Sequence, residues 1–256
     1  MNPKVSIIMN CHNGEEFLEE AIDSVYNQTY QNWEIIFVDN NSNDSTSKIA
    51  KSFDNKLIYF KLDNFLSLYE ARNIALDLCN GKLISFLDSD DIWVPEKLEK
   101  QISILSKEYP IVYGGYQIIN SHKKKSKKYG LKPLSGFITD KLLTKNFISI
   151  GCVLIDSQLI KSYKFDPYFE LLGDYELWIR LSIKNKFNST ETILEYSRTH
   201  KSNITKTKSN LMTRERRYFY KKLFKILNYK YFLRVLYLAI KYEIKGLFLY
   251  FKKYKI

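Results

Sequence analysis

The chain has 256 residues, of which 45% are hydrophobic, so it can build one large domain or a domain with an appendage, and general disorder is excluded. Its formal net charge is +12. Residues 1–213 contribute only +1 of this (27 basic and 26 acidic residues), whereas residues 214–256 contribute +11 (13 basic and 2 acidic residues). The charge therefore belongs to a C-terminal segment, and a uniformly basic protein is excluded.

The cysteines and the N-terminus favour a cytoplasmic protein. Cys11, Cys79 and Cys152 are odd in number and form no CxxC pair, which argues against a disulfide framework or a structural zinc site. The first apolar run, residues 5–9, is too short for the apolar region of a signal peptide and fits a first strand better.

Short apolar runs and segments with helical spacing of apolar residues alternate over the first hundred residues. Continuous apolar strands between amphipathic helices predict a mostly parallel sheet with helices on both faces, so the expected fold class is α/β. Strands are expected at residues 5–9, 33–38, 57–61 and 82–87, and helices at residues 15–27, from Asp44 or Ser45 to Phe53, and at residues 68–78.

The pattern is more irregular after residue 100. Strands are expected at residues 111–119 and 151–156, and a helix is expected to begin near Gly173. The lysine-rich residues 123–128 are interpreted as a solvated loop. From about residue 210 the sequence is helical in pattern and basic.

Polar residues follow three of the expected strands directly, at residues 10–13, 39–42 and 88–91. In open parallel sheets, ligands bind beyond the C-terminal ends of the strands. We therefore expect these three segments to meet at one edge of the sheet and to form the functional site.

Three carboxylates in the segment Asp88-Ser89-Asp90-Asp91 follow an apolar strand. Carboxylates alone would repel a diphosphate, but Mg²⁺ or Mn²⁺ between them would bind both, because these cations prefer hard oxygen ligands. The cation would then act as a Lewis acid on the departing phosphate. The alternative is a solvated acidic turn that caps the next helix.

Asp39 ends the second expected strand. Its carboxylate can accept a hydrogen bond from a nucleobase or a ribose. Alternatively, it closes an Asx-turn that leads into the next helix, and the sequence alone leaves both interpretations open.

Five segments, in family order and spacing, resemble family 2 of the inverting glycosyltransferases, which have the GT-A fold. The resemblance is close over residues 4–100 and looser to about residue 205. It implies a GT-A domain at residues 1–210, with a nucleotide-sugar-binding half (1–100) and an acceptor-side half (101–210). The segments are 5–13 (VSIIMNCHN), 21–28 (AIDSVYNQ), 33–46 (WEIIFVDNNSNDST), 71–76 (ARNIAL) and 80–93 (NGKLISFLDSDDIW).

The resemblance also assigns roles in donor binding. Two departures, residues 10–13 (NCHN) in place of Pro-Thr-Tyr-Asn and Ser67 in place of a glycine, leave the identity of the donor open. The implied roles are uracil contact for Asp39, positions flanking the base for Asn10 and Arg72, proximity to the donor ribose for Asp88, and coordination of Mn²⁺ or Mg²⁺ by Asp90 with Asp91 close by.

An inverting transferase needs a base that takes the proton from the acceptor hydroxyl. In the family this base comes from a Glu-Asp pair at the start of a later helix, so the resemblance assigns it to Asp174, with Gly173 in place of the glutamate. The alternative is that Asp174 only caps a helix. His200 matches a family histidine that can approach the metal or diphosphate; otherwise it is an exposed loop residue.

The expected function is transfer of a sugar from a nucleotide-diphosphate sugar to a hydroxyl of a glycan or lipid-linked glycan, in the assembly of cell-surface polysaccharide or lipopolysaccharide. The resemblance implies a UDP-sugar as the donor. A non-catalytic nucleotide-sugar binder or scaffold is the alternative. A nucleotidyltransferase fits poorly, because residues 10–14 (NCHNG) do not resemble a glycine-rich phosphate loop with Lys or Arg.

Residues 211–256 predict a basic amphipathic helical tail. Arg234, Lys241 and Lys245 interrupt its apolar runs, so a membrane-spanning helix is not expected. We weigh attachment to an anionic membrane surface first, docking of the apolar face on the domain second, and nucleic-acid binding last, so nucleic acid is not an expected partner. Membrane attachment would place the protein on the cytoplasmic face of the inner membrane.

Overall fold

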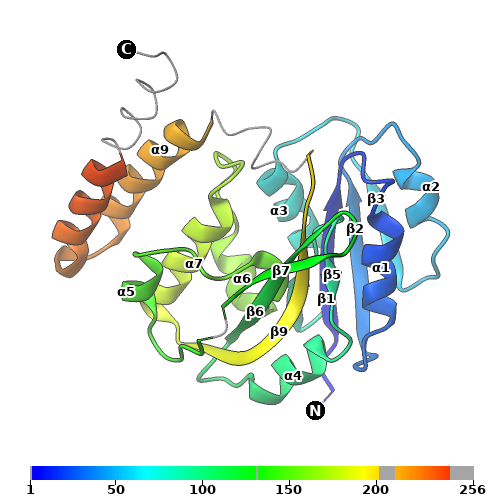
Figure 1. Cartoon of the computed structure of the whole chain (residues 1–256), viewed down its shortest axis with the longest axis horizontal. Coiled ribbons are helices and arrows are strands. Elements are labelled where there is room, and N and C mark those ends of the chain that lie inside the picture. The colour runs from blue at the N-terminus through cyan, green and yellow to red at the C-terminus, as the bar shows by residue number, and fades with distance from the viewer. Residues whose placement is uncertain (1, 131, 202–210, 243–256) are drawn as a thin grey trace.

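The fold is a central sheet with helices on both faces, seen in a computed structural model that describes residues 2–130, 132–201 and 211–242 (Figure 1). Its strands follow the order β3-β2-β1-β4-β8-β6-β9-β5, with β7 paired to β6. The strands are β1 Val5–Cys11, β2 Trp33–Asp39, β3 Leu57–Lys61, β4 Leu83–Phe86, β5 Ile92–Trp93, β6 Ile111–Asn120, β7 Lys125–Tyr129, β8 Leu154–Asp156 and β9 Phe187–Thr199.

Helices connect the strands and cover the sheet. The first four parallel strands, β3-β2-β1-β4, continue into an antiparallel β8, after which β6 and β9 run parallel to each other. The expected α/β class with a mostly parallel sheet is thus confirmed. The helices are α1 Leu18–Tyr26, α2 Thr46–Ala50, α3 Leu68–Leu78, α4 Lys97–Ile104, α5 Thr139–Leu142, α6 Ser157–Tyr163, α7 Gly173–Lys184 and α9 Leu211–Ile226, with 3-10 turns η1 Ile150–Cys152 and η2 Tyr229–Tyr231.

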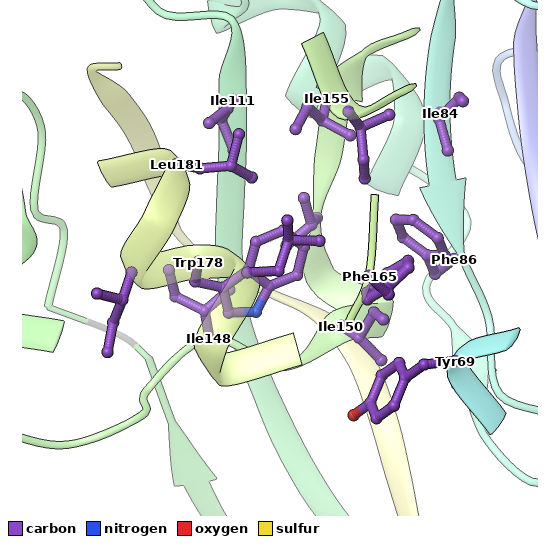
Figure 2. Packing of buried hydrophobic residues seen from close by; sticks show 14 of the residues in the cluster. Tyr69, Ile84, Phe86, Ile111, Ile148, Ile150, Ile155, Phe165, Trp178 and Leu181 are labelled. Carbon is purple, nitrogen blue, oxygen red and sulfur yellow. The ribbon is translucent and has the colours of Figure 1, made fainter. Parts of the chain in front are cut away.

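Strands β1, β2 and β4 are mostly apolar because both faces of the sheet are buried there. Along β1, Ile7 and Met9 pack in the cluster beneath α1 and α4, whereas Ile8 packs in the larger cluster on the other face. That larger cluster joins α3, α6 and α7 to the sheet (Figure 2). Figure 2 shows Tyr69 at one end of it, where its ring lies 5.2 Å from that of Phe165.

The structure differs from the sequence-based expectation in the second half. The loop prediction for residues 123–128 is wrong for residues 125–128, which belong to β7, an exposed strand paired with β6. Lysine side chains can occupy such a strand because they remain in water. The strand expected at 151–156 is shorter, since η1 precedes β8. The long strand β9 was not expected, because its polar residues mask its pairing with β6.

The C-terminal region packs on the larger cluster rather than standing apart. Phe219 and Leu223 of α9, and Val235 and Leu238 of a following helix at residues 232–242, are buried in the larger cluster. The docking interpretation therefore holds for these apolar faces. None of the helices in the described ranges is long and apolar enough to cross a membrane. The expected tail continues through residues 243–256, which lie outside the described residues.

Candidate active site

The site lies where β1, β2 and β4 end side by side. The register places Asn10 beside Val38 and Ile8 beside Phe86, so the polar segments after these strands meet at one edge. The loops are joined by hydrogen bonds. The Asn13 backbone N–H donates to Ser42 Oγ (3.0 Å), and the Gly14 N–H donates to Thr46 Oγ1 (2.9 Å). This meeting of chain segments follows from the parallel pairing.

Asp39 is fully buried and organises the loop after β2. Its Oδ1 accepts the Ser42 backbone N–H at 2.8 Å, which is the Asx-turn, and its Oδ2 accepts the Tyr59 hydroxyl at 2.6 Å. The turn brings Asn41 into the left-handed region with a φ of 60°, which asparagine tolerates better than most residues. Each carboxylate oxygen has a further lone pair, so the turn does not exclude contact with a ligand.

The Asn10 side chain at this edge is buried without hydrogen-bond partners among the described residues. Both its Nδ2 and its Oδ1 are buried, and neither has a hydrogen-bond partner among the described residues. An amide buried in this way costs about 1–3 kcal/mol relative to one with partners. A planar ligand with adjacent donor and acceptor groups, such as a nucleobase, would satisfy both atoms.

Arg72 and Asp88 form an ion pair between α3 and the segment after β4. The Arg72 side chain is only 4% exposed, whereas that of Asp88 is 42% exposed. Arg72 also lies over the ring of Tyr69, with its guanidinium carbon 5.4 Å from the ring centroid. The buried cation thus holds a half-exposed carboxylate at the surface of the site.

Asp90 lies beside His200 of the segment that follows β9. Its Oδ2 is 2.7 Å from His200 Nε2. Burial and the nearby Asp88 raise the pKa of Asp90. In the described part of the chain no group of three or more His, Cys, Asp or Glu side chains is arranged to hold a metal. Asp90 and His200 nevertheless have the right donor atoms, and a bound phosphate would supply the remaining oxygens, as Mg²⁺ and Mn²⁺ sites commonly require.

The Asp91 side chain lies in a different environment from that of Asp90. Its Oδ1 accepts the Arg198 backbone N–H at 2.6 Å, and the residue is only 6% exposed. Burial, together with repulsion from Glu195 of β9, raises the pKa of Asp91 well above its usual range. The Glu195 carboxylate in turn accepts the Ser149 hydroxyl at 2.8 Å. The contacts of Asp91 with Arg198 and Glu195 thus join the acidic segment to β9.

Asp174 is the second residue of α7 and lies near the Arg72–Asp88 pair, whose charges act on it. Its backbone N–H donates to the Tyr69 hydroxyl (3.1 Å), and its Oδ1 accepts the Tyr175 N–H (2.7 Å). Burial raises the pKa of Asp174 to about 6 against opposing hydrogen bonds and the charge of Arg72. A carboxyl group with such a pKa is well suited to take a proton near neutral pH.

Comparison with known proteins identifies the family. Residues 6–159 match the model described as "Glycosyl transferase family 2". The chain belongs to this family. It is also 36% identical over 189 residues, 72% of each chain, to the Escherichia coli UDP-Glc:alpha-D-GlcNAc-diphosphoundecaprenol beta-1,3-glucosyltransferase WfgD. The protein is thus a glycosyltransferase.

Solved structures show the same fold at low sequence identity. S. aureus TarS (residues 1–349) in complex with UDP-GlcNAc aligns with a TM-score of 0.74 over 93% of this chain and 71% of that one, at 17% identity. The mannosyltransferase PcManGT of Pyrobaculum calidifontis, in complex with GDP-Man and Mn²⁺, aligns with a TM-score of 0.68 over 89% and 66%, at 14% identity. The GT-A expectation is confirmed.

The structure of the glycosyltransferase also adds site residues that the sequence did not single out. Tyr69 contacts Asp174, and Arg198 donates its Nε–H to the Asp90 carbonyl at 2.7 Å while its guanidinium pairs with Glu20. The sequence signal for Arg198 was its place two residues before His200. Tyr69 carried no such signal, because a tyrosine in an amphipathic helix normally indicates only the core.

Proposed function

We propose that the protein is an inverting, metal-dependent glycosyltransferase that moves a sugar from a UDP-sugar to a hydroxyl of a lipid-linked glycan. One arrangement carries the proposal. Asp90 with His200 would provide cation ligands, and Asp174 would provide a separate carboxyl group of raised pKa near the Arg72–Asp88 pair. A leaving-group site and a base held apart are what a single displacement requires.

The donor would bind along the ends of β1 and β2. The unpartnered Asn10 amide and the free lone pairs of Asp39 suit the edge of a uracil ring. A relative that uses UDP-Glc and a structural neighbour that binds UDP-GlcNAc support UDP as the nucleotide. Asp88, held by Arg72, would accept a hydrogen bond from the ribose.

The diphosphate would then lie near Asp90 and His200. Mn²⁺ or Mg²⁺ bound there would supply Lewis-acid stabilisation of the departing phosphate. Asp90 is our choice of protein ligand, together with His200, because both have partly exposed side chains. We assign Asp91 a supporting role beside them, since its carboxyl group contacts Arg198 and Glu195.

The acceptor hydroxyl would approach Asp174. In its ionised form the carboxylate takes the hydroxyl proton as the oxygen attacks the anomeric carbon, on the face opposite the diphosphate. The buried Tyr69 keeps the Asp174 backbone in place through its hydroxyl. Neutral pH leaves Asp174 ionised, since its pKa of about 6 is lower.

The C-terminal region would bring the enzyme to its acceptor. The helix at residues 232–242 buries Val235 and Leu238 on one side and exposes apolar side chains on the other. Exposed aromatic and aliphatic side chains beside lysines are typical of helices that lie on anionic membranes. We name this set the apolar face; it comprises Phe232, Leu233 (73% exposed), Leu236, Tyr237 (62%) and Ile240 of the helix, with Tyr229 (89%) of η2 just before it.

Both earlier interpretations of the tail are thus combined in this proposal, on different faces of one helix. The inward face docks on the domain, and the apolar face would contact the lipid of the cytoplasmic side of the inner membrane. The relative from Escherichia coli, by its name, acts on a diphosphoundecaprenol-linked sugar, which supports a lipid-linked acceptor here.

Release of UDP tests the catalytic proposal. Wild type should release nucleotide diphosphate from one of a panel of UDP-, GDP- and dTDP-sugars, faster with a lipid-linked glycan acceptor, and only with Mn²⁺ or Mg²⁺. Asp90→Ala and Asp174→Asn should each lose this activity. Binding of UDP-sugars without turnover under all these conditions would contradict the proposal and identify a non-catalytic binder instead.

A further inference from the structure

Glu215 is a fully buried acid in the otherwise basic helix α9. Its carboxylate accepts three consecutive backbone N–H groups: Oε1 from Glu170 at 2.7 Å, and Oε2 from Leu171 at 3.0 Å and Leu172 at 3.1 Å. Such a set of charge-assisted hydrogen bonds fixes a backbone segment strongly. The segment ends one residue before Gly173, at which α7 begins.

The start of α7 depends on residues from other elements. Its N-cap residue, Leu172, has no side chain that can cap, so the free N–H groups of the first turn need other acceptors. Glu215 accepts the N–H of Leu172, and the Tyr69 hydroxyl accepts that of Asp174. The backbone on each side of Gly173 is therefore held by α9 and α3.

A second contact attaches α9 to the same region. Lys222 Nζ lies 2.6 Å from Asp166 Oδ2 and 2.9 Å from Glu176 Oε1, and so bridges the segment before α7 to its first turn. The rings of Phe219 and Tyr175 stack 5.0 Å apart. Helix α9 thus contacts the chain both before and after Asp174.

Gly173 shows how closely this region is packed. A Cβ atom at this position would lie 2.5 Å from the Tyr69 ring, which is too close for any side chain. The backbone at residues 172–174 therefore lies directly against the Tyr69 ring. Its position depends on the contacts with Tyr69 of α3 and with Glu215 of α9. A shift of this segment would move Asp174 away from Tyr69 and Arg72.

We propose that Glu215 is a positioning residue for the general base, and that α9 is part of the catalytic unit rather than a detachable tail. This rests on the proposed function of Asp174. The Glu215 carboxylate holds residues 170–172, the segment holds the start of α7, and α7 presents Asp174 in its partly buried place. Its action is through the backbone, with no contact to substrate.

Loss of Glu215 should change the base and leave the donor side unaffected. A displacement of about 1 Å at a reacting group can cost up to about 100-fold in rate, so kcat should fall between about tenfold and 100-fold. Water would reach Asp174, so the pH at which activity is half-maximal should move below the pKa of about 6 in the wild type. The donor KM should stay the same, because Asn10, Asp39 and Asp90 belong to other elements.

Among the described residues, the charged and titratable groups around Asp174 do not include Glu215. They are Tyr69 and Arg72 of α3, Asp88 after β4 and Tyr116 of β6. A change in the pH profile on mutation of Glu215 would therefore report movement of the segment rather than loss of a neighbouring charge.

The experiment compares full-length Glu215→Ala and Glu215→Gln with Thr213→Ala, an exposed position on the same helix, as control. The pH dependence of kcat and the donor KM are measured below the unfolding temperature of each variant. We expect Glu215→Ala to lower kcat and shift the acidic limb, Glu215→Gln to lie between it and the wild type because one acceptor oxygen remains, and the control to match the wild type.

Several outcomes would overturn the inference. If both Glu215 variants unfold at a lower temperature but keep the wild-type kcat and pH profile, the residue is structural only. If Glu215→Ala does not fold, Glu215→Gln decides alone, by the same kcat and pH readouts. A wild-type protein without turnover on any donor would overturn the proposed function as well, whereas an active wild type with unaffected variants overturns only the positioning role.

Discussion

His200 Nε2 lies 2.7 Å from Asp90 Oδ2, although 110 residues separate them in the chain. The contact exists because β9 pairs with β5, which directly follows the acidic segment. Arg198, two residues before His200, reinforces it by donating to the Asp90 carbonyl. A nitrogen and a carboxylate oxygen are thus brought together at the place where the proposed function needs a cation.

Removal of His200 should weaken the response to metal rather than abolish activity. In His200→Ala, the Mn²⁺ concentration for half-maximal UDP release should rise about tenfold or more, because one cation ligand is lost while Asp90 remains. His122→Ala is the control, since His122 is exposed on the β6–β7 turn. An unchanged Mn²⁺ dependence in His200→Ala would remove His200 from the metal site.

Asn10→Ala should separate stability from donor binding. The variant removes two buried atoms without partners, so the free protein should unfold at the same temperature or a higher one. The increase in unfolding temperature caused by UDP should shrink, because that increase depends on affinity for the ligand. Thermal unfolding with and without UDP measures both effects.

Asn73→Ala provides the contrasting control. Asn73 exchanges two hydrogen bonds of 2.9 Å with the Phe165 backbone and so supports the fold. This variant should unfold at a lower temperature and keep the full effect of UDP. The nucleobase role of Asn10 would be refuted if Asn10→Ala behaved in the same way.

The pKa of Asp174 predicts a pH dependence of both rate and stability. Activity should rise through about pH 6, as the carboxyl group ionises. The folded state keeps the proton to a higher pH than the unfolded state, whose carboxyl has the ordinary pKa of 3.8, so this group lowers stability as pH rises from about 4 to 6.

Asp174→Asn should therefore be inactive but more stable than the wild type at pH 7, by an amount on the order of 3 kcal/mol or less. The advantage should vanish below about pH 4, where the carboxyl group is protonated in both states. Chemical denaturation at pH 4 and pH 7 measures the difference. If Asp174→Asn and the wild type were equally stable at both pH values, burial of the ionised Asp174 would not destabilise the folded protein.

The apolar face predicts membrane binding that depends on two exposed side chains. The Leu233→Ser, Tyr237→Ser double variant should bind vesicles of phosphatidylglycerol and phosphatidylcholine several-fold more weakly than the wild type at low salt, because apolar insertion is lost. Ile58→Ser, at a 41% exposed position on β3, is the control. Flotation of the vesicles measures binding, and a wild type that stays in solution would refute the proposal.

Much of the site was visible in the sequence because the first half of the molecule is assembled from neighbouring strands. A polar residue that follows an apolar strand can be placed from the sequence, because neighbouring parallel strands end at a common edge of the sheet. Asn10, Asp39 and Asp88 were placed there from their order alone, and the structure has them at this edge. Their roles toward a ligand remain proposals.

The second half was less predictable, because its strands pair over long distances and their polar residues hide the pattern. Nothing in the local sequence shows that β9 inserts between β6 and β5, and this pairing alone brings His200 to Asp90 and Glu195 to Asp91. Likewise, a net charge of +11 over residues 214–256 concealed that one of the two acids there is a buried anchor.

The sequence by itself determined the family, the α/β class and the acidic segment after β4, since these depend on local periodicity and on motifs that are contiguous in the chain. Only the tertiary structure decided which carboxylates meet which partners. Asp174 gains its raised pKa from burial beside α3, and α9 gains its attachment through Glu215. Both effects arise from contacts between segments that are far apart in the sequence. The free energy of such contacts depends on both partners, so it cannot be inferred from the sequence of either segment alone.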